Sequence, residues 1–209
     1  MMLVIGLTGS IGMGKSTAAK HFAKRGIAVF DADAEVHRLY EGEAVPAIAA
    51  SFPNVVVGNR VDRSLLAQEL AVSPDKLRVL EAIVHPMVVK AELDFLRDQE
   101  AKGAKFAVLE IPLLFETCAE KRLDFSVVVS ASEEVQRARV LARPGMSAEK
   151  LDQLLKRQLS DREKRARADY VVDSGGSIAD MEAEIDRLLE SLKGKQGQVM
   201  ERLRRGDFN

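Results

Sequence analysis

The chain has 209 residues, of which 46% are hydrophobic, enough to bury the core of one compact domain with smaller appendages. Its formal net charge of -1 argues against a protein that coats nucleic acid or an anionic membrane, because both partners demand an excess of Lys and Arg. The single cysteine, Cys118, excludes an internal disulfide framework, and the scattered histidines exclude a metal-ligand cluster. No apolar run reaches the roughly 20 residues of a membrane-spanning helix, so we expect a soluble, cytoplasmic protein.

Five short apolar runs are typical of strands, and each is followed by a polar or helix-like stretch. This alternation indicates an α/β fold with a parallel sheet. The five runs are Leu3–Leu7, Ile27–Phe30, Phe106–Ile111, Phe125–Val129 and Tyr170–Val172. After the first run, the pattern predicts a helix over Lys15–Arg25 that is closed by Gly26.

The stretch from residue 32 to residue 102 has a different character, because it predicts several helices without a strong strand and contains four prolines. We interpret it as a helical insertion, within a single domain, that covers one end of the sheet. The core then comprises residues 1–31, 103–135 and 168–192, and it ends in an amphipathic helix with apolar positions from Ile178 to Leu192. The polar tail, residues 193–209, is expected to be loosely ordered.

The sharpest motif is Gly9-Ser10-Ile11-Gly12-Met13-Gly14-Lys15-Ser16, which matches the phosphate-binding pattern G-x-x-x-x-G-K-[ST] between a strand and a helix. Its glycines let backbone N–H groups face a polyphosphate, and the helix adds the positive end of its dipole. Lys15 is expected to reach the β- and γ-phosphates of a nucleotide, and Ser16 is expected to ligate Mg²⁺. The expected nucleotide contacts are Gly9, Gly12, Met13, Gly14, Lys15, Ser16 and Thr17. A chance glycine-rich helix start is the alternative, and the intact motif in this context disfavours it.

A second group of interest follows the second strand, where the chain reads Phe30-Asp31-Ala32-Asp33. The carboxyl ends of neighbouring parallel strands open onto one crevice, so we expect Asp33 to lie near the γ-phosphate. A carboxylate there can orient an alcohol and take its proton, whereas a phosphate acceptor would require cationic groups. Paired aspartates therefore favour transfer to a hydroxyl group. The alternative is that Asp31 or Asp33 forms an Asx turn or caps a helix predicted at Ala34–Tyr40.

Further segments follow these two motifs in order. They are Ile83-Val84-His85-Pro86, Pro112-Leu113-Leu114-Phe115-Glu116, the spaced residues Gln136, Arg139 and Arg143, and Ala168-Asp169-Tyr170-Val171-Val172-Asp173. Together with the phosphate loop and the Asp-Ala-Asp segment, this ordered set resembles the dephospho-CoA kinase family over roughly Leu3 to Ser177.

The resemblance implies a P-loop NTPase three-layer fold with a five-stranded parallel sheet, a helical domain that receives the coenzyme, and a mobile helical lid. It implies ATP and dephospho-CoA as substrates and Mg²⁺ as the metal, and we expect no nucleic acid, membrane or obligate protein partner. The expected acceptor contacts are Asp31, Asp33, His37, His85 and Leu114. The alternative for His37 is a surface helix face, and the alternative for His85 is a packed or capping group before a helix-starting Pro86.

Two residues depart from the family pattern. Glu110 stands at the end of the third strand, where the family more often has Asp, and Ser174 stands where it usually has Asn. Glu110 could still assist Mg²⁺ through water, or it could be a strand-end carboxylate that faces solvent.

Residues 136–167 are expected to form the lid, and this segment is strongly basic. From residue 137 onward it holds ten Lys or Arg against four acidic residues, a local charge of +6, and it has no aromatic side chain for stacking on nucleic-acid bases. Such a segment can close over ATP, exclude water and stabilise charge on the transferred phosphoryl group. We assign the stabilising role to Arg143 and expect Arg139 to hold its helix against the nucleotide. The positions interpreted as ordinary solvated ones include Lys156, Arg157 and Lys164.

The expected reaction is in-line transfer of the ATP γ-phosphoryl group to the 3′-hydroxyl of the dephospho-CoA ribose. In it Asp33 acts as the base, while Lys15, Mg²⁺ and Arg143 neutralise charge. The nearest enzymatic alternative is a kinase for another small alcohol, such as shikimate or gluconate. The alternative from another class is a nucleotide-gated switch, although the chain lacks the guanine-reading sequence Asn-Lys-x-Asp.

Overall fold

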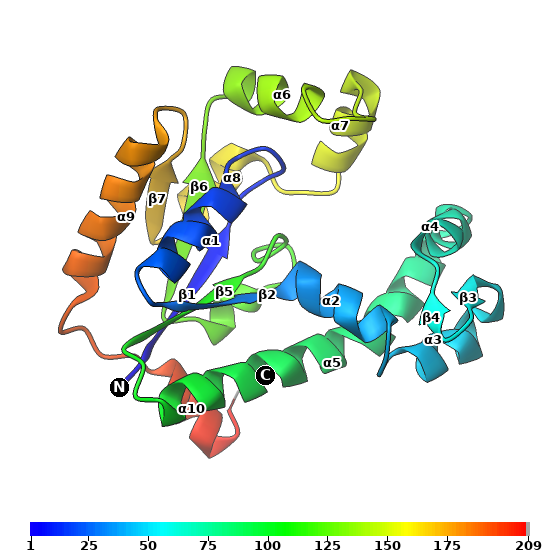
Figure 1. Cartoon of the computed structure of the whole chain (residues 1–209), viewed down its shortest axis with the longest axis horizontal. Helices are drawn as coiled ribbons and strands as arrows, with labels where there is room; N and C mark the ends of the chain where they lie inside the picture. The colour runs from blue at the N-terminus through cyan, green and yellow to red at the C-terminus, as the bar shows by residue number, and fades with distance from the viewer. Residues whose placement is uncertain (208–209) are drawn as a thin grey trace. The chain divides into compact units, whose positions relative to one another are not determined.

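The computed structural model describes residues 1–207, apart from the side chain of Pro74. The chain divides into two compact units, which are described separately below (Figure 1). Unit 1 consists of Met1–Phe30 and the chain from Asp98 onward, and unit 2 is Asp31–Arg97.

A five-stranded sheet has the strand order β2-β5-β1-β6-β7. Strand β1 pairs in parallel with β5 and β6, and β7 pairs in parallel with β6. The strands are β1 (Leu3–Thr8), β2 (Ala28–Asp31), β5 (Phe106–Glu110), β6 (Phe125–Ser130) and β7 (Tyr170–Asp173). Each lies within one residue, at both ends, of a run predicted from apolar patterning, so the predicted α/β fold with a parallel sheet is confirmed.

The helices of unit 1 cover the sheet and extend beyond its carboxyl edge. They are α1 (Lys15–Lys24), the 3₁₀ turn η2 (Ala119–Arg122), α6 (Glu133–Leu141), α7 (Ala148–Leu155), α8 (Asp161–Arg167), α9 (Ile178–Leu192) and α10 (Val199–Arg205). Figure 1 shows α1 and α9 side by side, with α6 and α7 at the top of the view. Alternate residues of β1, namely Leu3, Ile5 and Leu7, pack into the core with α1 and α9.

Helix α1, which carries the phosphate loop at its start, is tied to α9 by charged side chains. The ring of His21 is nearly buried, with Nε2 3.0 Å from Oδ1 of Asp186 and Nδ1 3.2 Å from Oε1 of Glu182. Arg25 also donates to Asp186. Hydrogen bonds from Arg25 and then from His21 hold the pKa of the Asp186 carboxyl below its usual range.

Unit 2 is mainly helical and has its own apolar cluster, which includes Leu39, Ile48 and Phe52. Its elements are α2 (Ala32–Tyr40), α3 (Val45–Ser51), the 3₁₀ turn η1 (Pro53–Val55), the short antiparallel strands β3 (Val56–Val57) and β4 (Arg60–Val61), α4 (Arg63–Ala71) and α5 (Pro74–Ala101), whose last residues belong to unit 1. Pro86 lies inside α5, so the interpretation of Pro86 as a helix start is wrong.

The prediction of a loosely ordered tail is also wrong for the described part of the chain, because α10 packs against the rest of unit 1. Val199 and Met200 have no exposed surface, and Leu203 is buried. The Asp124 carboxylate holds the helix start, since it accepts hydrogen bonds from the backbone N–H of Gln198 and Val199 at 2.7 and 3.1 Å. The same carboxylate accepts a bond from the N–H of Val4 at 2.8 Å, which joins the tail to β1.

If α10 is part of the folded core, Met200→Ala should lower the free energy of unfolding by about 2–5 kcal/mol, because it removes a fully buried side chain and leaves a cavity. Urea denaturation measures this change. Arg205→Ala, on the exposed face of the same helix, is the matched control and should cost less than about 1 kcal/mol. Equal effects of the two substitutions would contradict the packed helix.

Candidate active site

The phosphate loop approaches its neighbours too closely for any residue but glycine at two positions. A Cβ atom on Gly9 would lie 2.6 Å from the carbonyl oxygen of Val129 in β6. A Cβ atom on Gly12 would lie 2.5 Å from a methyl carbon of Val140 in α6, and Gly12 also has φ 80°. The loop therefore lies against β6 and α6.

Helix α1 begins at Lys15 directly after Gly14, which adopts the left-handed conformation with φ 89°. Its first turn contains no acidic residue, so nothing there opposes the positive end of the helix dipole. Ser16 is exposed and Thr17 is partly exposed in that turn. The first-turn N–H groups and these hydroxyls form a site suited to a phosphate chain.

Lys15 is held beside the loop by Glu110, the last residue of β5. Lys15 Nζ lies 2.5 Å from Glu110 Oε1, and the two side chains are 15% and 7% exposed. The alternative in which Glu110 faces solvent is therefore wrong. This carboxylate therefore holds the ammonium group of Lys15 at the end of β5.

Arg139 and Ser174 lock α6 onto the loop. Arg139 donates from Nη1 to Ser174 Oγ at 3.1 Å and from Nη2 to the Ser174 carbonyl at 2.6 Å. Ser174 Oγ in turn donates to the carbonyl of Met13 at 2.6 Å. Gln136 adds a bond from Nε2 to the carbonyl of Ile11 at 2.7 Å. Ser174 thus connects Arg139 to the phosphate loop, a role that the sequence did not reveal.

A cavity of about 320 Å³ lies beside the loop between α1, α6 and the start of α9. Its lining combines loop backbone, two guanidinium groups and apolar side chains, and includes Gly12, Gly14, Arg139, Arg143, Ser174, Ile178 and Met181. Sequence reasoning missed the contribution of residues 174–181. The signal was present, because this turn follows the carboxyl end of a parallel strand, where ligands bind in such sheets.

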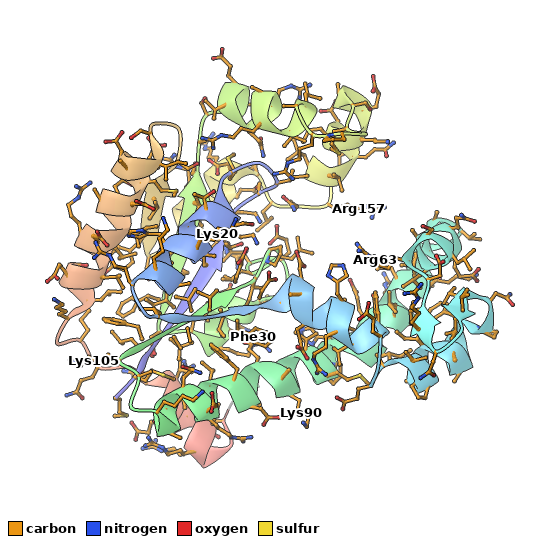
Figure 2. All side chains as sticks on the ribbon, viewed as in Figure 1. Lys20, Phe30, Arg63, Lys90, Lys105 and Arg157 are labelled. Carbon is orange, nitrogen blue, oxygen red and sulfur yellow. The ribbon has the colours of Figure 1, made fainter. Side chains whose placement is uncertain are left out.

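The remaining lid cations differ in their environments. Arg143 is exposed between α6 and α7, and Lys156 and Arg157 are exposed after α7, where Figure 2 shows Arg157 projecting from the lid segment. Lys164 is different, because it has no exposed surface and pairs with Glu116 at 2.9 Å. The interpretation of Lys164 as a solvated position is therefore wrong.

The expected acceptor residues in unit 2 lie at the end of β2, on α2 and on α5. Asp31 accepts a hydrogen bond from the backbone N–H of Ala34 at 3.0 Å, so it caps α2 as the alternative proposed. Asp33 is exposed in the first turn of α2, and His37 is exposed one turn later. His85 is exposed within α5, which rules out the packed and capping alternatives for its side chain.

Leu114, expected to contact the acceptor, belongs to unit 1. Its side chain has no exposed surface and lies next to Gly6 of β1. In this conformation Leu114 is a core residue whose side chain offers no surface to a substrate. Met13 is buried as well, and its backbone is bonded within the protein: its N–H donates to the Ser10 carbonyl at 3.1 Å, and its carbonyl accepts from Ser174 Oγ at 2.6 Å.

Residues 1–207 contain no group of three or more His, Cys, Asp or Glu side chains placed to hold a metal ion. Among the helices of the same residues, none is long and apolar enough to cross a membrane.

Comparison with known proteins identifies relatives along most of the chain. A family model described as "Dephospho-CoA kinase" matches residues 3–180. The dephospho-CoA kinase of Rhodopseudomonas palustris (strain HaA2) is 55% identical over 91% of this chain and 96% of its own length. A solved Thermus thermophilus protein is 39% identical, with a TM-score of 0.82 over 92% of this chain and 99% of its own. The dephospho-CoA kinase of Campylobacter jejuni is similar in fold, with a TM-score of 0.70 at 24% identity over 92% of this chain and 98% of its own.

If Ser174 holds Arg139 against the loop, Ser174→Ala should weaken nucleotide binding about five- to tenfold. The substitution removes the hydroxyl that bonds both the Arg139 guanidinium and the Met13 carbonyl. Calorimetric titration with a non-hydrolysable ATP analogue measures this affinity. Ser126→Ala is the matched control, since Ser126 is also buried and bonds Asp169 at the opposite end of β6. It should lower stability and leave nucleotide affinity unchanged; equal affinity losses would remove Ser174 from the site.

Proposed function

This chain belongs to the dephospho-CoA kinase family and is an ATP-dependent kinase, and we propose roles for its residues in transferring the γ-phosphoryl group to the 3′-hydroxyl of dephospho-CoA. The observation that carries the proposal is the phosphate loop with Lys15 beside a cavity lined by Arg139. This arrangement can hold a nucleotide by both its phosphates and its base.

ATP is expected to bind with its phosphates on the loop and its base in the 320 Å³ cavity. The N–H groups at the start of α1 and Lys15 bind the phosphates, and Thr17 supports the α-phosphate. The guanidinium of Arg139 offers a flat face for the base, and Ile178 and Met181 supply apolar contacts. Ile178 is 62% exposed, which leaves its side chain free for this contact.

Mg²⁺ fits this site as a metal held mainly by the substrate. The donor set is hard oxygen: Ser16 would bind through its exposed hydroxyl, and Glu110 would act through water from the end of β5. When bound there, the metal would supply positive charge to neutralise the phosphates, with Ser16 and Glu110 as the protein groups that hold it. Few protein ligands are needed in such a site, because substrate phosphates and water supply the others.

Asp33 is proposed as the group that orients the acceptor hydroxyl and takes its proton. Both aspartates in this segment are exposed, but the Asp31 carboxylate already accepts the hydrogen bond that caps α2, so we assign the role to Asp33. His37 and His85 are exposed in unit 2 and are proposed to contact dephospho-CoA. Arg143, exposed at the edge of the cavity, is proposed to meet the charge that develops on the transferred group.

A cytoplasmic location, without an obligate partner protein, completes the proposal. The cytoplasmic location is supported by the exposed, free thiol of Cys118, which suits a reducing compartment.

The decisive experiment measures ADP release from ATP and Mg²⁺ with dephospho-CoA, shikimate, gluconate, AMP or no acceptor, with products identified by mass. We expect ADP release that depends on dephospho-CoA and yields coenzyme A. Phosphorylation of another alcohol would shift the proposal to a different small-molecule kinase. ADP release without any phosphorylated acceptor would favour a nucleotide-gated switch.

Asp33→Asn should lower kcat by about 10²–10⁴-fold with little change in KM, because the amide cannot accept the hydroxyl proton. Steady-state kinetics with both substrates measures the two constants separately. Glu35→Gln, which removes another carboxylate from the first turn of α2, is the matched control and should keep turnover near wild type. Unchanged kcat in Asp33→Asn would remove this residue from the mechanism.

Glu110→Gln should lower kcat about tenfold or more without weakening ATP binding, because it releases Lys15 from its ion pair but removes a carboxylate from the metal's surroundings. Glu110→Asp keeps the charge and should retain more activity than Glu110→Gln. The measurements are turnover at saturating Mg²⁺ and equilibrium binding of an ATP analogue. Equal activity in Glu110→Gln and wild type would restrict Glu110 to a structural part.

A further inference from the structure

We propose that Glu116 is a positioning residue that fixes the end of the lid, residues 136–167, and that it does so through a buried pair with Lys164. The proposal rests on the kinase function above, but its structural claim can be tested without turnover. All of the residues involved lie in unit 1.

The pair is a buried ion pair, and loss of either partner from such a pair strongly destabilises the fold. Lys164 has no exposed surface, and its Nζ lies 2.9 Å from Oε1 of Glu116, whose side chain is 15% exposed. Lys164 Nζ also donates to the carbonyl of Pro112 at 3.2 Å. Removing one member of such a pair strands a buried charge, whereas replacing both by apolar residues is close to neutral.

The same carboxylate oxygen reaches the lid backbone. Glu116 Oε1 accepts a hydrogen bond from the N–H of Leu159 at 2.8 Å. Leu159 directly precedes Ser160, which caps α8 in a reciprocal pair with Glu163. Glu116 therefore holds the chain at the point where the link from α7 meets α8.

Helix α8 is itself fixed to the sheet, and Leu159 attaches the link between α7 and α8. Helix α7 is also held to α6, because Arg137 Nη1 donates to Asp152 Oδ1 at 3.1 Å. Arg165 donates to Ser130 Oγ at 3.2 Å, and Ser130 Oγ donates to Asp161 at 2.8 Å. At its other end the lid is fixed by Gln136 and Arg139. Between these attachments, Leu151 is the buried residue of α7, and the cations there are exposed.

The anchor also connects to the phosphate loop. The Pro112 carbonyl that accepts from Lys164 accepts a second bond from Thr8 Oγ1 at 3.1 Å. Thr8 is the residue before Gly9, the first glycine of the loop. Glu116 and Lys164 thereby set where the lid stands relative to the loop, and with it how well the lid cations shield the transferred group from water.

The test compares Glu116→Gln with Asp124→Asn, because Asp124 is also a carboxylate that accepts several backbone bonds but serves α10 and β1. Hydrogen exchange of residues 148–159 is the readout that does not depend on activity. We expect exchange there to rise about tenfold or more in Glu116→Gln and to stay at the wild-type rate in Asp124→Asn.

Turnover is measured well below the melting temperature of each variant. Glu116→Gln should lower kcat about tenfold with KM nearly unchanged and should raise the share of ADP released without coenzyme A, whereas Asp124→Asn should lower only stability. Exchange and turnover that match between the two variants would overturn the proposal. Failure of the wild type to form coenzyme A would instead overturn the proposed function. The exchange result would still decide whether Glu116 fixes the end of the lid.

A second variant covers the case in which Glu116→Gln does not fold. Glu116→Leu/Lys164→Met removes both buried charges and deprives the Leu159 N–H of its acceptor. We expect this double variant to fold with near wild-type stability, with faster exchange at residues 148–159 and reduced kcat. Wild-type exchange and turnover in the double variant would show that the pair is not needed to fix the lid.

Discussion

The active site depends on a steric constraint, the close approach of the phosphate loop to β6 and α6. Gly9 and Gly12 lie where a side-chain carbon would fall 2.6 and 2.5 Å from neighbouring atoms. Because the backbone comes this close, the side chains of Gln136 and Ser174 can bond the loop carbonyls of Ile11 and Met13. Gln136 and Ser174 therefore hold the loop in its shape, and Ser174 also lines the cavity beside it.

Three carboxylates near the ends of the sheet strands differ in their contacts because their burial and hydrogen-bond partners differ. Glu110 is buried against Lys15 and takes part in an ion pair. Asp31 is used by the backbone of α2 as a cap. Asp33 is exposed in the first turn of α2 and is the carboxylate that we propose for the acceptor. Burial and backbone hydrogen bonds, rather than residue type, separate these roles.

The lid, residues 136–167, is connected at one end to the phosphate loop and at the other to Thr8, the residue before the loop. Arg139 and Gln136 hold α6, and the hydrogen bonds around Pro112 connect Lys164 to Thr8. The basic residues between these attachments are largely exposed. Such an arrangement allows cationic side chains to approach a bound nucleotide while the loop itself keeps its geometry.

The sequence alone determined the strands, the first helix and the phosphate loop, because these follow from local patterns. Apolar runs placed all five sheet strands within one residue at each end, and the loop glycines stand where close backbone approach demands them. Only the tertiary structure decided which polar residues are buried. Lys164 reads as one cation among ten in a basic segment, and Glu116 buries it from a distant part of the chain. The tail looks polar, yet Asp124, 74 residues before Gln198, holds it in place. These features depend on long-range contacts, which no local pattern of residues encodes.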